Sequence, residues 1–407
     1  MNRVGLKEEA VLSTARPIQR FVHLDMIRGL AALLVLAGHL RAFQFRGYAE
    51  VSAAYPGVIV KAFYFVTGFG HQAVIIFFAL SGFLVGGQAL DAIAQSAFFW
   101  RGYLARRLTR LWLVILPALL LTLFFDRVGA DLTGGAGYDG RYYRIFNSGP
   151  LEPRGADHSL TTFLGNLAFV QGIYAPVFGS NGPLWSLANE FWYYIVFPLA
   201  FLLFARGPVV SQAIHATALV LLVTFLPAGL WEGGLVWAAG AFAGWIVRKK
   251  LFPSFWRLIA SRVAGLALLC VALVATKLLS EFNASDLVLG VAVAASLPVL
   301  AALPEAGHLY STLARAGSEI SYSLYLTHFP LLTLIAFAGL GPARSAPTAE
   351  SFVLYLGIGA LAIAWAAVVW WLFERHTDFV FRKVLGVIGA LRLGRSSRSD
   401  RVKVSSP

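Results

Sequence analysis

Uninterrupted apolar runs are the feature of this 407-residue chain that most restricts how it can fold. Hydrophobic residues make up 58% of the sequence and charged residues only 13%, whereas a soluble domain carries roughly a quarter charged residues. The runs are long enough to cross about 30 Å of hydrocarbon as helices. The sequence therefore predicts an all-α fold, a polytopic transmembrane bundle of about ten spans. We expect these spans at residues 27–45, 73–90, 108–126, 184–204, 212–229, 231–247, 262–280, 285–303, 320–340 and 352–373.

The basic residues predict the orientation of these spans. With ten spans, the arginine- and lysine-rich segments before the first span, after the second, after the sixth and after the last all fall on one side. The positive-inside rule makes that side cytoplasmic, for both chain termini. The net charge of +13 then follows from topology, and no nucleic-acid-binding motif accompanies it. We expect no nucleic acid partner.

The chain divides into three predicted segments. Residues 1–23 form a cytoplasmic N-terminal segment, and residues 24–376 form the membrane domain with one long extracytoplasmic loop at 127–183. Residues 377–407 form a basic, Ser-rich tail that we expect to be disordered. The first span is expected to be retained, because no small-residue cleavage site follows it. Only Leu230 and its neighbours separate the fifth span from the sixth.

The first span carries two polar residues, Arg28 and His39. Eleven residues at 100° each make three turns plus about 20°, so both side chains share one helical face, about 16 Å apart along the axis. Ionisable residues inside a membrane indicate a site facing the bundle interior. His39 is either a neutral histidine bonded to a facing helix or a general base.

Arginines gather where the third span begins. Arg107 and Arg110 are three residues apart on one helical face, Arg106 is adjacent, and Arg28 is predicted at the same depth. Such arginines are commonly topology anchors. Converging at one cytoplasmic mouth, they would instead bind a polyanion, because guanidinium groups bind phosphate in a bidentate manner.

The fourth span begins with an acidic, aromatic segment, NGPLWSLANEFWYY. Glu190 is predicted on its outer side, and aromatic residues such as Trp185 and Tyr193 suit either a sugar ring or an ordinary interfacial belt. Ser186 and Asn189 are interpreted as packing or helix hydrogen-bonding residues, with substrate contact as the alternative.

The remaining polar positions lie in three further segments. His328 lies within the ninth span, two residues before Pro330, which should free a backbone carbonyl. Glu374, Arg375 and His376 close the last span; one interpretation is that they are helix-end charges, and this is favoured for His376. Ser81 and the glycines after it favour close helix packing. Histidines and carboxylates are too scattered to indicate a metal site, and Cys270 is interpreted as core packing.

Six segments in this order resemble the acyltransferase-3 family, integral-membrane enzymes that acylate extracytoplasmic sugars: LDMIRGLAALLVLAGH, FFALSGFLVGG, RRLTRLWLVILP, LWSLANEFWYY, SYSLYLTHFP and FERH. The resemblance implies a cytoplasmic acyl-CoA donor, most often acetyl-CoA, and a glycan or glycolipid acceptor. It also implies the inner membrane of a bacterium as the location, with membrane lipid around the bundle.

The resemblance implies roles for particular residues. His39 falls on the family's catalytic histidine, with Glu190 as a second catalytic candidate. Arg28, Arg107 and Arg110, with Arg106 beside them, are implied to bind the donor. The acceptor is expected to contact the substrate-binding candidates Trp185, Ser186, Asn189, Tyr193 and His328.

The sequence departs from the family pattern at two positions. Asn189 stands where an acid is common, and His376 stands where proline is usual. No SGNH-type hydrolase segment follows the last span, so either this chain completes the transfer alone or a separate extracytoplasmic partner protein does. The rival class is a proton-coupled transporter of an anionic solute, which the absence of matched Gly- or Pro-interrupted halves disfavours.

Overall fold

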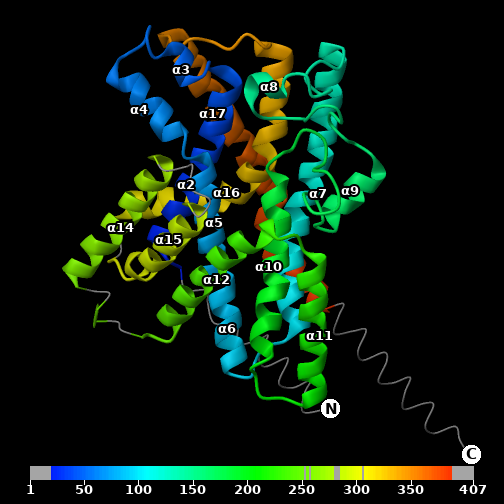
Figure 1. The fold of residues 1–407 in the computed structure, drawn as a ribbon, viewed down its shortest axis with the longest axis vertical. Coiled ribbons are helices and arrows are strands. Elements are labelled where there is room, and N and C mark those ends of the chain that lie inside the picture. The colour runs from blue at the N-terminus through cyan, green and yellow to red at the C-terminus, as the bar shows by residue number, and fades with distance from the viewer. Residues whose placement is uncertain (1–19, 252–253, 256–257, 279–284, 305–306, 387–407) are drawn as a thin grey trace, which may run out of the picture.

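The computed structural model describes residues 20–251, 254–255, 258–278, 285–304 and 307–386. Within these residues the chain forms helices and isolated bridge pairs, without a strand ladder (Figure 1). The elements are α2 (Val22–Gln44), α3 (Tyr48–Val51), α4 (Val58–Thr67), α5 (Gly70–Ser81), the π-helical η1 (Gly82–Gly86), α6 (Gly87–Ala94), α7 (Trp100–Thr133), α8 (Tyr143–Phe146), α9 (Leu160–Leu167), α10 (Leu184–Leu202), α11 (Val209–Phe225), α12 (Gly229–Arg248), α14 (Ile259–Leu278), α15 (Ser285–Ala301), α16 (His308–Leu334), the π-helical η2 (Ile335–Leu340), α17 (Ala349–Leu372) and the 3-10 turn η3 (Glu374–His376).

The all-α prediction is confirmed, and each of the ten predicted spans corresponds to a helix. By length and composition, seven helical segments of the described chain can cross a membrane: 22–44, 70–94, 100–133, 229–248, 259–278, 308–340 and 349–386. The other predicted spans are α10, which has a polar beginning, and the 17-residue helices α11 and α15. The chain is therefore a multi-pass membrane protein in which these three helices differ from the rest.

Two predicted boundaries are wrong. The break between the fifth and sixth spans lies at residues 226–228 rather than at Leu230, because Pro227 holds the preceding Leu226 in an extended conformation (φ −86°, ψ 136°). The tail assigned to residues 377–407 begins too early, since residues 377–386 are helical and Phe381 is buried under the Arg106 guanidinium. Its later residues, 387–407, and residues 1–19 of the N-terminal segment lie outside the described chain.

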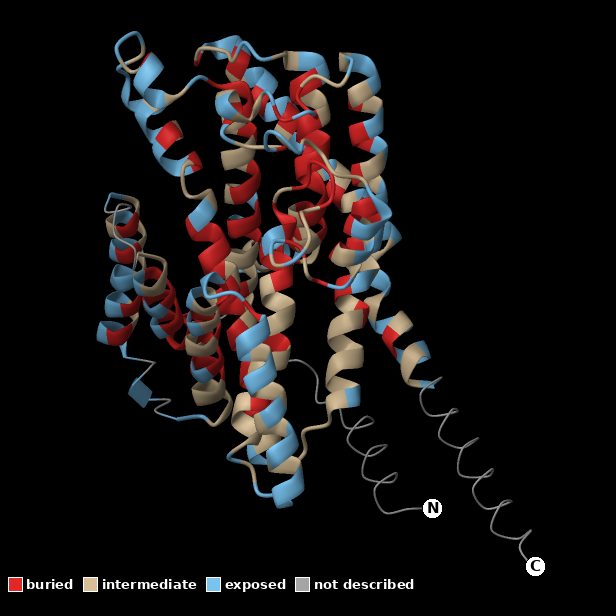
Figure 2. Ribbon diagram, turned by 45° about the vertical axis from the view of Figure 1, so that its right-hand side comes forward, coloured by how far each residue is buried: buried red, intermediate tan, exposed pale blue. Residues whose placement is uncertain are grey.

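The centre of the bundle is the packing of α2 against α16. Gly29 makes this close approach possible, since a Cβ atom there would lie 3.1 Å from the backbone of Gly317. Figure 2 shows buried residues concentrated in these central helices, whereas α11 and α14 are exposed along much of their length. Cys270 on α14 is exposed, so the core-packing role predicted for it is wrong. As predicted, Arg28 and His39 share one face, and that face meets α16.

Small residues bring α5, η1 and α6 against α12, which confirms the packing role predicted for this glycine-rich segment. A Cβ atom added at Gly82 would lie 1.9 Å from the Trp237 carbonyl oxygen, and one at Gly240 would lie 2.1 Å from the Ala79 carbonyl oxygen. Ser81 departs from the prediction, because its hydroxyl group bonds to Glu190. The helix is π-helical immediately after Ser81, a local form that is frequent at functional sites.

The 127–183 connection is shorter than predicted and enters the bundle. Helix α7 continues to Thr133, and the chain then forms α8 and α9 before it descends between α7 and α16. The amide of Asn181 donates to Thr122 Oγ1 at 3.1 Å and to the Leu326 carbonyl oxygen at 2.9 Å. Leu326 is four residues before Pro330, so Asn181 binds the carbonyl that proline was predicted to free.

A buried carboxylate holds the end of this connection. Asp126, 1% exposed, accepts hydrogen bonds from the Ser180 backbone at 2.7 Å, from the Ser180 hydroxyl at 2.6 Å and from His158 at 2.8 Å. Next to His158, hydrogen bonds donated by Thr162 and Ser159 lower the pKa of the Asp157 carboxyl. As a result, α10 starts midway along α7 and α16, and the α10–α11 hairpin occupies the lower half of the molecule in Figure 1.

We predict that Gly240→Ala lowers the thermal unfolding midpoint of the purified protein. The added methyl group would collide with the backbone of α5, which cannot change rotamer as a side chain can. The expected loss in the free energy of unfolding is about 1–3 kcal/mol. Gly357→Ala on α17 is the matched control, because a Cβ atom there meets nothing within 4 Å. Equal midpoints for the two variants would contradict this account of the α5–α12 contact.

Candidate functional site

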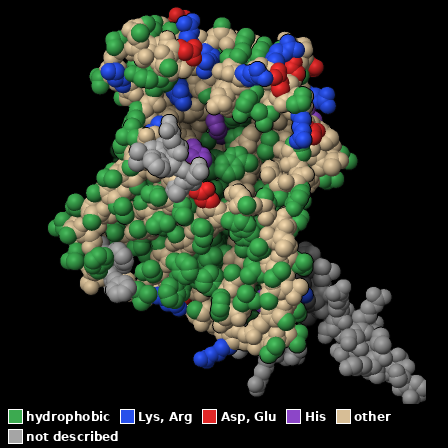
Figure 3. Space-filling view, viewed as in Figure 1, with side chains coloured by type: hydrophobic (Ala, Val, Ile, Leu, Met, Phe, Trp, Pro, Cys, Tyr) green, Lys and Arg blue, Asp and Glu red, His purple; other side chains and the backbone are tan. Residues whose placement is uncertain are grey.

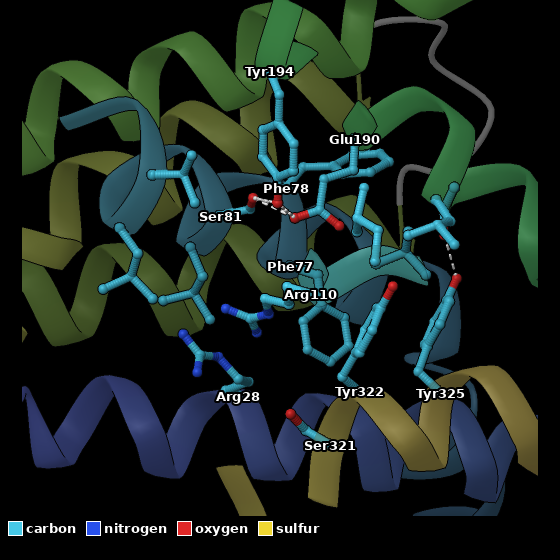
Figure 4. A pocket seen from close by; sticks show the side chains of 17 residues that line it. Arg28, Phe77, Phe78, Ser81, Arg110, Glu190, Tyr194, Ser321, Tyr322 and Tyr325 are labelled. Atoms are coloured by element: carbon cyan, nitrogen blue, oxygen red, sulfur yellow. Dashed lines mark hydrogen bonds between the residues drawn. The ribbon is translucent and has the colours of Figure 1, made fainter. Parts of the chain in front are cut away.

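An internal cavity lies between α2, α5, α7, α10 and α16. Figure 4 shows Arg28 and Arg110 pointing into it from different helices, with Glu190 and Tyr194 on the opposite wall. Its polar lining residues are Arg28, Ser81, Arg110, Ser186, Glu190, Tyr194, Ser321, Tyr322 and Tyr325, and the remainder are apolar. The cavity therefore combines cations, a carboxylate and hydroxyl groups within an apolar bundle.

Arg28 is held at the base of the cavity by α16. Its guanidinium donates to the Ser318 hydroxyl at 3.1 Å and lies 3.8 Å from the Asp25 carboxylate. Ser318 in turn donates to Asp25 at 2.9 Å. Arg110 reaches the cavity from α7, 5.8 Å from the ring centre of Tyr322. The two arginines predicted to lie at the same depth thus face one cavity.

Glu190 lies in the same cavity, which corrects the prediction that it lies on the outer side, away from the arginines. Its carboxylate accepts hydrogen bonds from Ser81 and, at 2.5 Å, from Tyr194, and Trp237 donates to Ser81 at 3.1 Å. The prediction failed because α10 starts inside the bundle rather than at its edge. The second turn of α10 is consequently at the depth of Arg110.

The other arginines of the predicted cluster occupy two different places. Arg107 is turned inward, 5.8 Å from the Tyr103 ring centre, and its buried Nε atom has no hydrogen-bond partner in the described chain. Arg106 points away from the cavity and lies 4.5 Å from the ring centre of Phe381. Of the four predicted donor arginines, the structure therefore places Arg28 and Arg110 in the cavity lining, whereas Arg107 and Arg106 lie outside that lining.

Glu374, for which the sequence suggested only a helix-end charge, is a further residue of the charged site. Its carboxylate accepts hydrogen bonds from the Ser323 hydroxyl at 2.6 Å and from the Ser323 backbone at 3.2 Å. Its charge acts on both Arg28 and Arg110. The available signal was a carboxylate ending a span on the same predicted side as the arginines.

His39 and His328 form a pair above the cavity. His39 Nδ1 lies 2.9 Å from His328 Nε2, and the ring of Phe329 packs edge-on against His39 at 4.9 Å. His328 is 1% exposed, so the structure places this substrate-binding candidate beside the candidate catalytic histidine, out of contact with solvent. The pairing was not predicted, because 289 residues separate the two histidines.

The neighbours of this pair define its proton positions. His328 Nδ1 lies 2.7 Å from the Leu324 carbonyl oxygen, which only accepts, so Nδ1 carries the hydrogen. In neutral His328 the Nε2 atom is then an acceptor, and His39 must donate to it from Nδ1. His39 Nε2 is left with its lone pair, the form that a base or nucleophile requires.

Tyr325 connects the cavity to the histidine pair. Its ring lines the cavity, lies 6.3 Å from the His328 ring, and packs against Phe77 at 5.8 Å. Its hydroxyl group lies 2.7 Å from the Ser186 hydroxyl, so Ser186 supports Tyr325. Arg28 and His39 lie on one uninterrupted helix, about 16 Å apart at 1.5 Å per residue.

The remaining substrate-binding candidates lie outside the cavity lining. Tyr193 is buried and donates to the Leu230 carbonyl oxygen at 2.8 Å, which is a packing role against α12. Trp185 is 38% exposed and packs edge-on against Phe78. Asn189 is half-buried on α10. Within the described residues, no group of histidines, cysteines and carboxylates could hold a metal ion.

The fold and the cavity define a multi-pass membrane protein with an internal charged site. The family model of the acyltransferase domain matches residues 21–371, and the chain belongs to this acyltransferase family. Acyltransferase MdmB of Streptomyces mycarofaciens is 30% identical over 198 residues, which are 47% of this chain and 42% of that protein, so the alignment spans less than half of the relative. No solved structure matches the chain. The chain is therefore a multi-pass membrane protein of an acyltransferase family, and this family match favours the acyltransferase interpretation over the rival transporter interpretation.

We predict that ¹⁵N NMR of the histidine-labelled protein shows His39 protonated at Nδ1 and unprotonated at Nε2 near neutral pH. The resonances can be assigned by comparison with His39→Gln. In His328→Phe, the acceptor for Nδ1–H is removed and His39 should lose this preference. An Nε2-protonated His39 in the unaltered protein would contradict the inferred hydrogen-bond direction.

Proposed function

We propose that this protein transfers an acyl group, most readily acetyl, from cytoplasmic acyl-CoA to a hydroxyl group of an extracytoplasmic glycan or glycolipid at a bacterial inner membrane. The observation that carries the proposal is the arginine-lined cavity below the His39–His328 pair, with Tyr325 bordering both. It supports a donor bound at one end of a path and chemistry at the other. In the alternative arrangement, a separate extracytoplasmic partner protein would complete the transfer.

The arginines of the cavity suit the donor. Coenzyme A carries three phosphates, and guanidinium groups are the side chains that bind phosphate in a bidentate manner. Arg107 has a buried unpartnered Nε atom, and Arg110 lines the cavity. We assign these two residues and Arg28 to the donor phosphates, and leave out Arg106. Glu190 and Glu374 would orient the guanidinium groups, so Glu190 is assigned to the donor side and not to the glycan.

His39 Nε2 is the proposed base. As the acceptor oxygen attacks the thioester carbonyl carbon, Nε2 takes the hydroxyl proton, the carbon–sulfur bond breaks, and the proton passes to the thiolate. His328 would accept the Nδ1–H of the resulting imidazolium and hold the ring in place. In the alternative mechanism, His39 Nε2 attacks the thioester carbonyl carbon and the thiolate leaves. The acylated His39 then passes its acyl group to the acceptor. Trapping a labelled acyl group on the protein would distinguish the two mechanisms, because only the second forms an acylated His39.

We predict that His39→Ala abolishes thiol release from acetyl-CoA while retaining donor binding. Loss of a positioned base costs about 10²–10⁴-fold in rate, whereas the donor arginines lie about three helical turns away. The assay uses the purified protein in nanodiscs with a glycan acceptor, and reports thiol release and acetyl-CoA affinity in parallel. Unchanged turnover in the variant would remove His39 from the chemical step. Absence of both binding and turnover in the unaltered protein, with acetyl-, succinyl- and longer acyl-CoA, would contradict the donor assignment.

We predict that Arg110→Gln weakens acyl-CoA binding at least ten-fold, because a charge-assisted hydrogen bond contributes about 1.5–3 kcal/mol. Arg106→Gln is the matched control on the same helix, since Arg106 faces Phe381 rather than the cavity. Isothermal titration of both variants measures the difference. If Arg106→Gln weakened binding as much as Arg110→Gln, general positive charge rather than the cavity would account for affinity.

A further inference from the structure

Four buried phenylalanine rings pack together next to the histidine pair. They are Phe43 on α2, Phe146 on α8, Phe329 on α16 and Phe337 in η2, and none is more than 5% exposed. The centre of the Phe43 ring lies 5.3 Å from that of Phe146 and 5.4 Å from that of Phe329. The Phe337 ring is 6.0 Å from Phe43 and 5.8 Å from Phe146. Helices distant in sequence thus form one close-packed phenylalanine cluster, with Phe43 at its centre.

The phenylalanine cluster is in direct contact with His39. The ring of Phe329 packs edge-on against the His39 ring, with 4.9 Å between the ring centres. Phe43 follows His39 by four residues on the same uninterrupted helix, so it lies one turn further along the same helical face. The surroundings of His39 therefore change at this point from the histidine pair to packed aromatic rings.

The connection between α7 and α10 covers the far side of the phenylalanine cluster. The rings of Tyr138 and Tyr142 pack edge-on against Phe337 at 5.1 and 5.6 Å. Gly137 (φ +87°) brings the backbone against the same ring, since a Cβ atom there would lie 2.7 Å from it. In Figure 3, charged side chains gather at the upper end of the molecule, where α8 lies in Figure 1, and hydrophobic side chains cover most of the side below. The cluster therefore lies between this charged end and the histidine pair.

The cavity lies on the opposite side of the histidine pair from the phenylalanine cluster. Along α2, Arg28 of the cavity lies about 16 Å from His39 in one direction, and Phe43 lies about 6 Å from His39 in the other. On α16 the order is the same, since Tyr325 of the cavity precedes His328 and Phe329 follows it. A ligand that extends from the cavity to His39 therefore ends facing the cluster.

This order along the helices determines which part of an acyl-CoA would meet the cluster. On the proposed function, which this step requires, the phosphates bind at the arginines and the sulfur atom approaches His39 from the cavity. The acyl group is bonded to the sulfur on the side away from the phosphates, so its last carbon atoms point toward Phe329 and Phe43. An acetyl group places only one methyl group there. Each further methylene group would have to displace a ring from a close-packed core, which is unfavourable.

We propose that the phenylalanine cluster restricts the donor to short acyl chains, and that Phe43 is the specificity-determining residue that meets the end of the chain. Phe43 packs against the three other rings and so cannot turn aside for a longer chain. Apolar pockets distinguish chains that differ by one methylene group by about ten-fold or more. The substrate class is therefore acetyl-CoA and its short-chain relatives, in preference to medium- and long-chain thioesters.

Isothermal titration of the purified full-length protein in nanodiscs tests this proposal. The ligands are acetyl-, butyryl- and hexanoyl-CoA, with CoA itself as the reference that has no acyl group. We expect the unaltered protein to bind hexanoyl-CoA at least about ten-fold more weakly than acetyl-CoA. In Phe43→Ala this ratio should fall to about three-fold or less, because loss of the ring makes room for the longer chain. Phe43→Leu is the smaller change, in which the ratio of butyryl- to acetyl-CoA affinity should shift in the same direction.

Phe45→Ala is the matched control. Phe45 is as deeply buried as Phe43, at 1% exposure, but packs against Phe63 and Phe352 at 5.2 and 5.4 Å, so its variant should keep the preference for acetyl-CoA. Equal affinities of the unaltered protein for acetyl- and hexanoyl-CoA would overturn the proposal, as would an equal gain in hexanoyl-CoA binding by Phe45→Ala and Phe43→Ala. Those outcomes leave the donor assignment intact. Absence of binding by every acyl-CoA would instead overturn the proposed function, and the chain-length limit with it.

Discussion

Charged side chains inside an apolar bundle must be neutralised by the protein itself, and this requirement organises the structure around the cavity. Arg28 and Arg110 come from two helices, and the carboxylates that offset their charge are Asp25 on α2, Glu190 on α10 and Glu374 after α17. An ionised guanidinium left alone in such surroundings would cost several kcal/mol. The arginines therefore require the helices around them to assemble in one arrangement, and the cavity is the space left between their partners.

The histidine pair obeys a different constraint, that of hydrogen-bond direction. A helix carbonyl, Leu324 O, can only accept, and this single fact orients His328, which orients His39 in turn. The position of the free lone pair at His39 Nε2 is thus determined by the backbone of a helix that begins nearly 270 residues later in the chain. Rigid elements support both histidines, which suits a site where geometry must be maintained.

The membrane class, the ten helical segments and the shared face of Arg28 and His39 could be predicted from the sequence, because hydropathy and helical periodicity are local properties. The family resemblance is confirmed by the family match. The His39–His328 contact, the position of Glu190 and the role of Glu374 could not be predicted, because each depends on which helices meet. Arg106 shows the same limit: it adjoins Arg107 in sequence and still points to Phe381. The depth at which α10 starts could not be predicted from the sequence, because it depends on buried polar contacts of Ser180 and Asn181 and not on the length of the apolar run.

Those contacts also restrict the order in which the protein can assemble. Asn181 bonds to Thr122, which precedes it, and to the carbonyl of Leu326, which is synthesised 145 residues later. Ser180 likewise lies 3.1 Å from Thr333 of α16. The start of α10 therefore cannot reach its final hydrogen bonds until α16 is in the membrane. Until then its amide and hydroxyl groups need water or other partners. During biogenesis the α10–α11 hairpin therefore stays at the edge of an incomplete bundle until α16 is inserted. The cavity is then completed among the last events of folding.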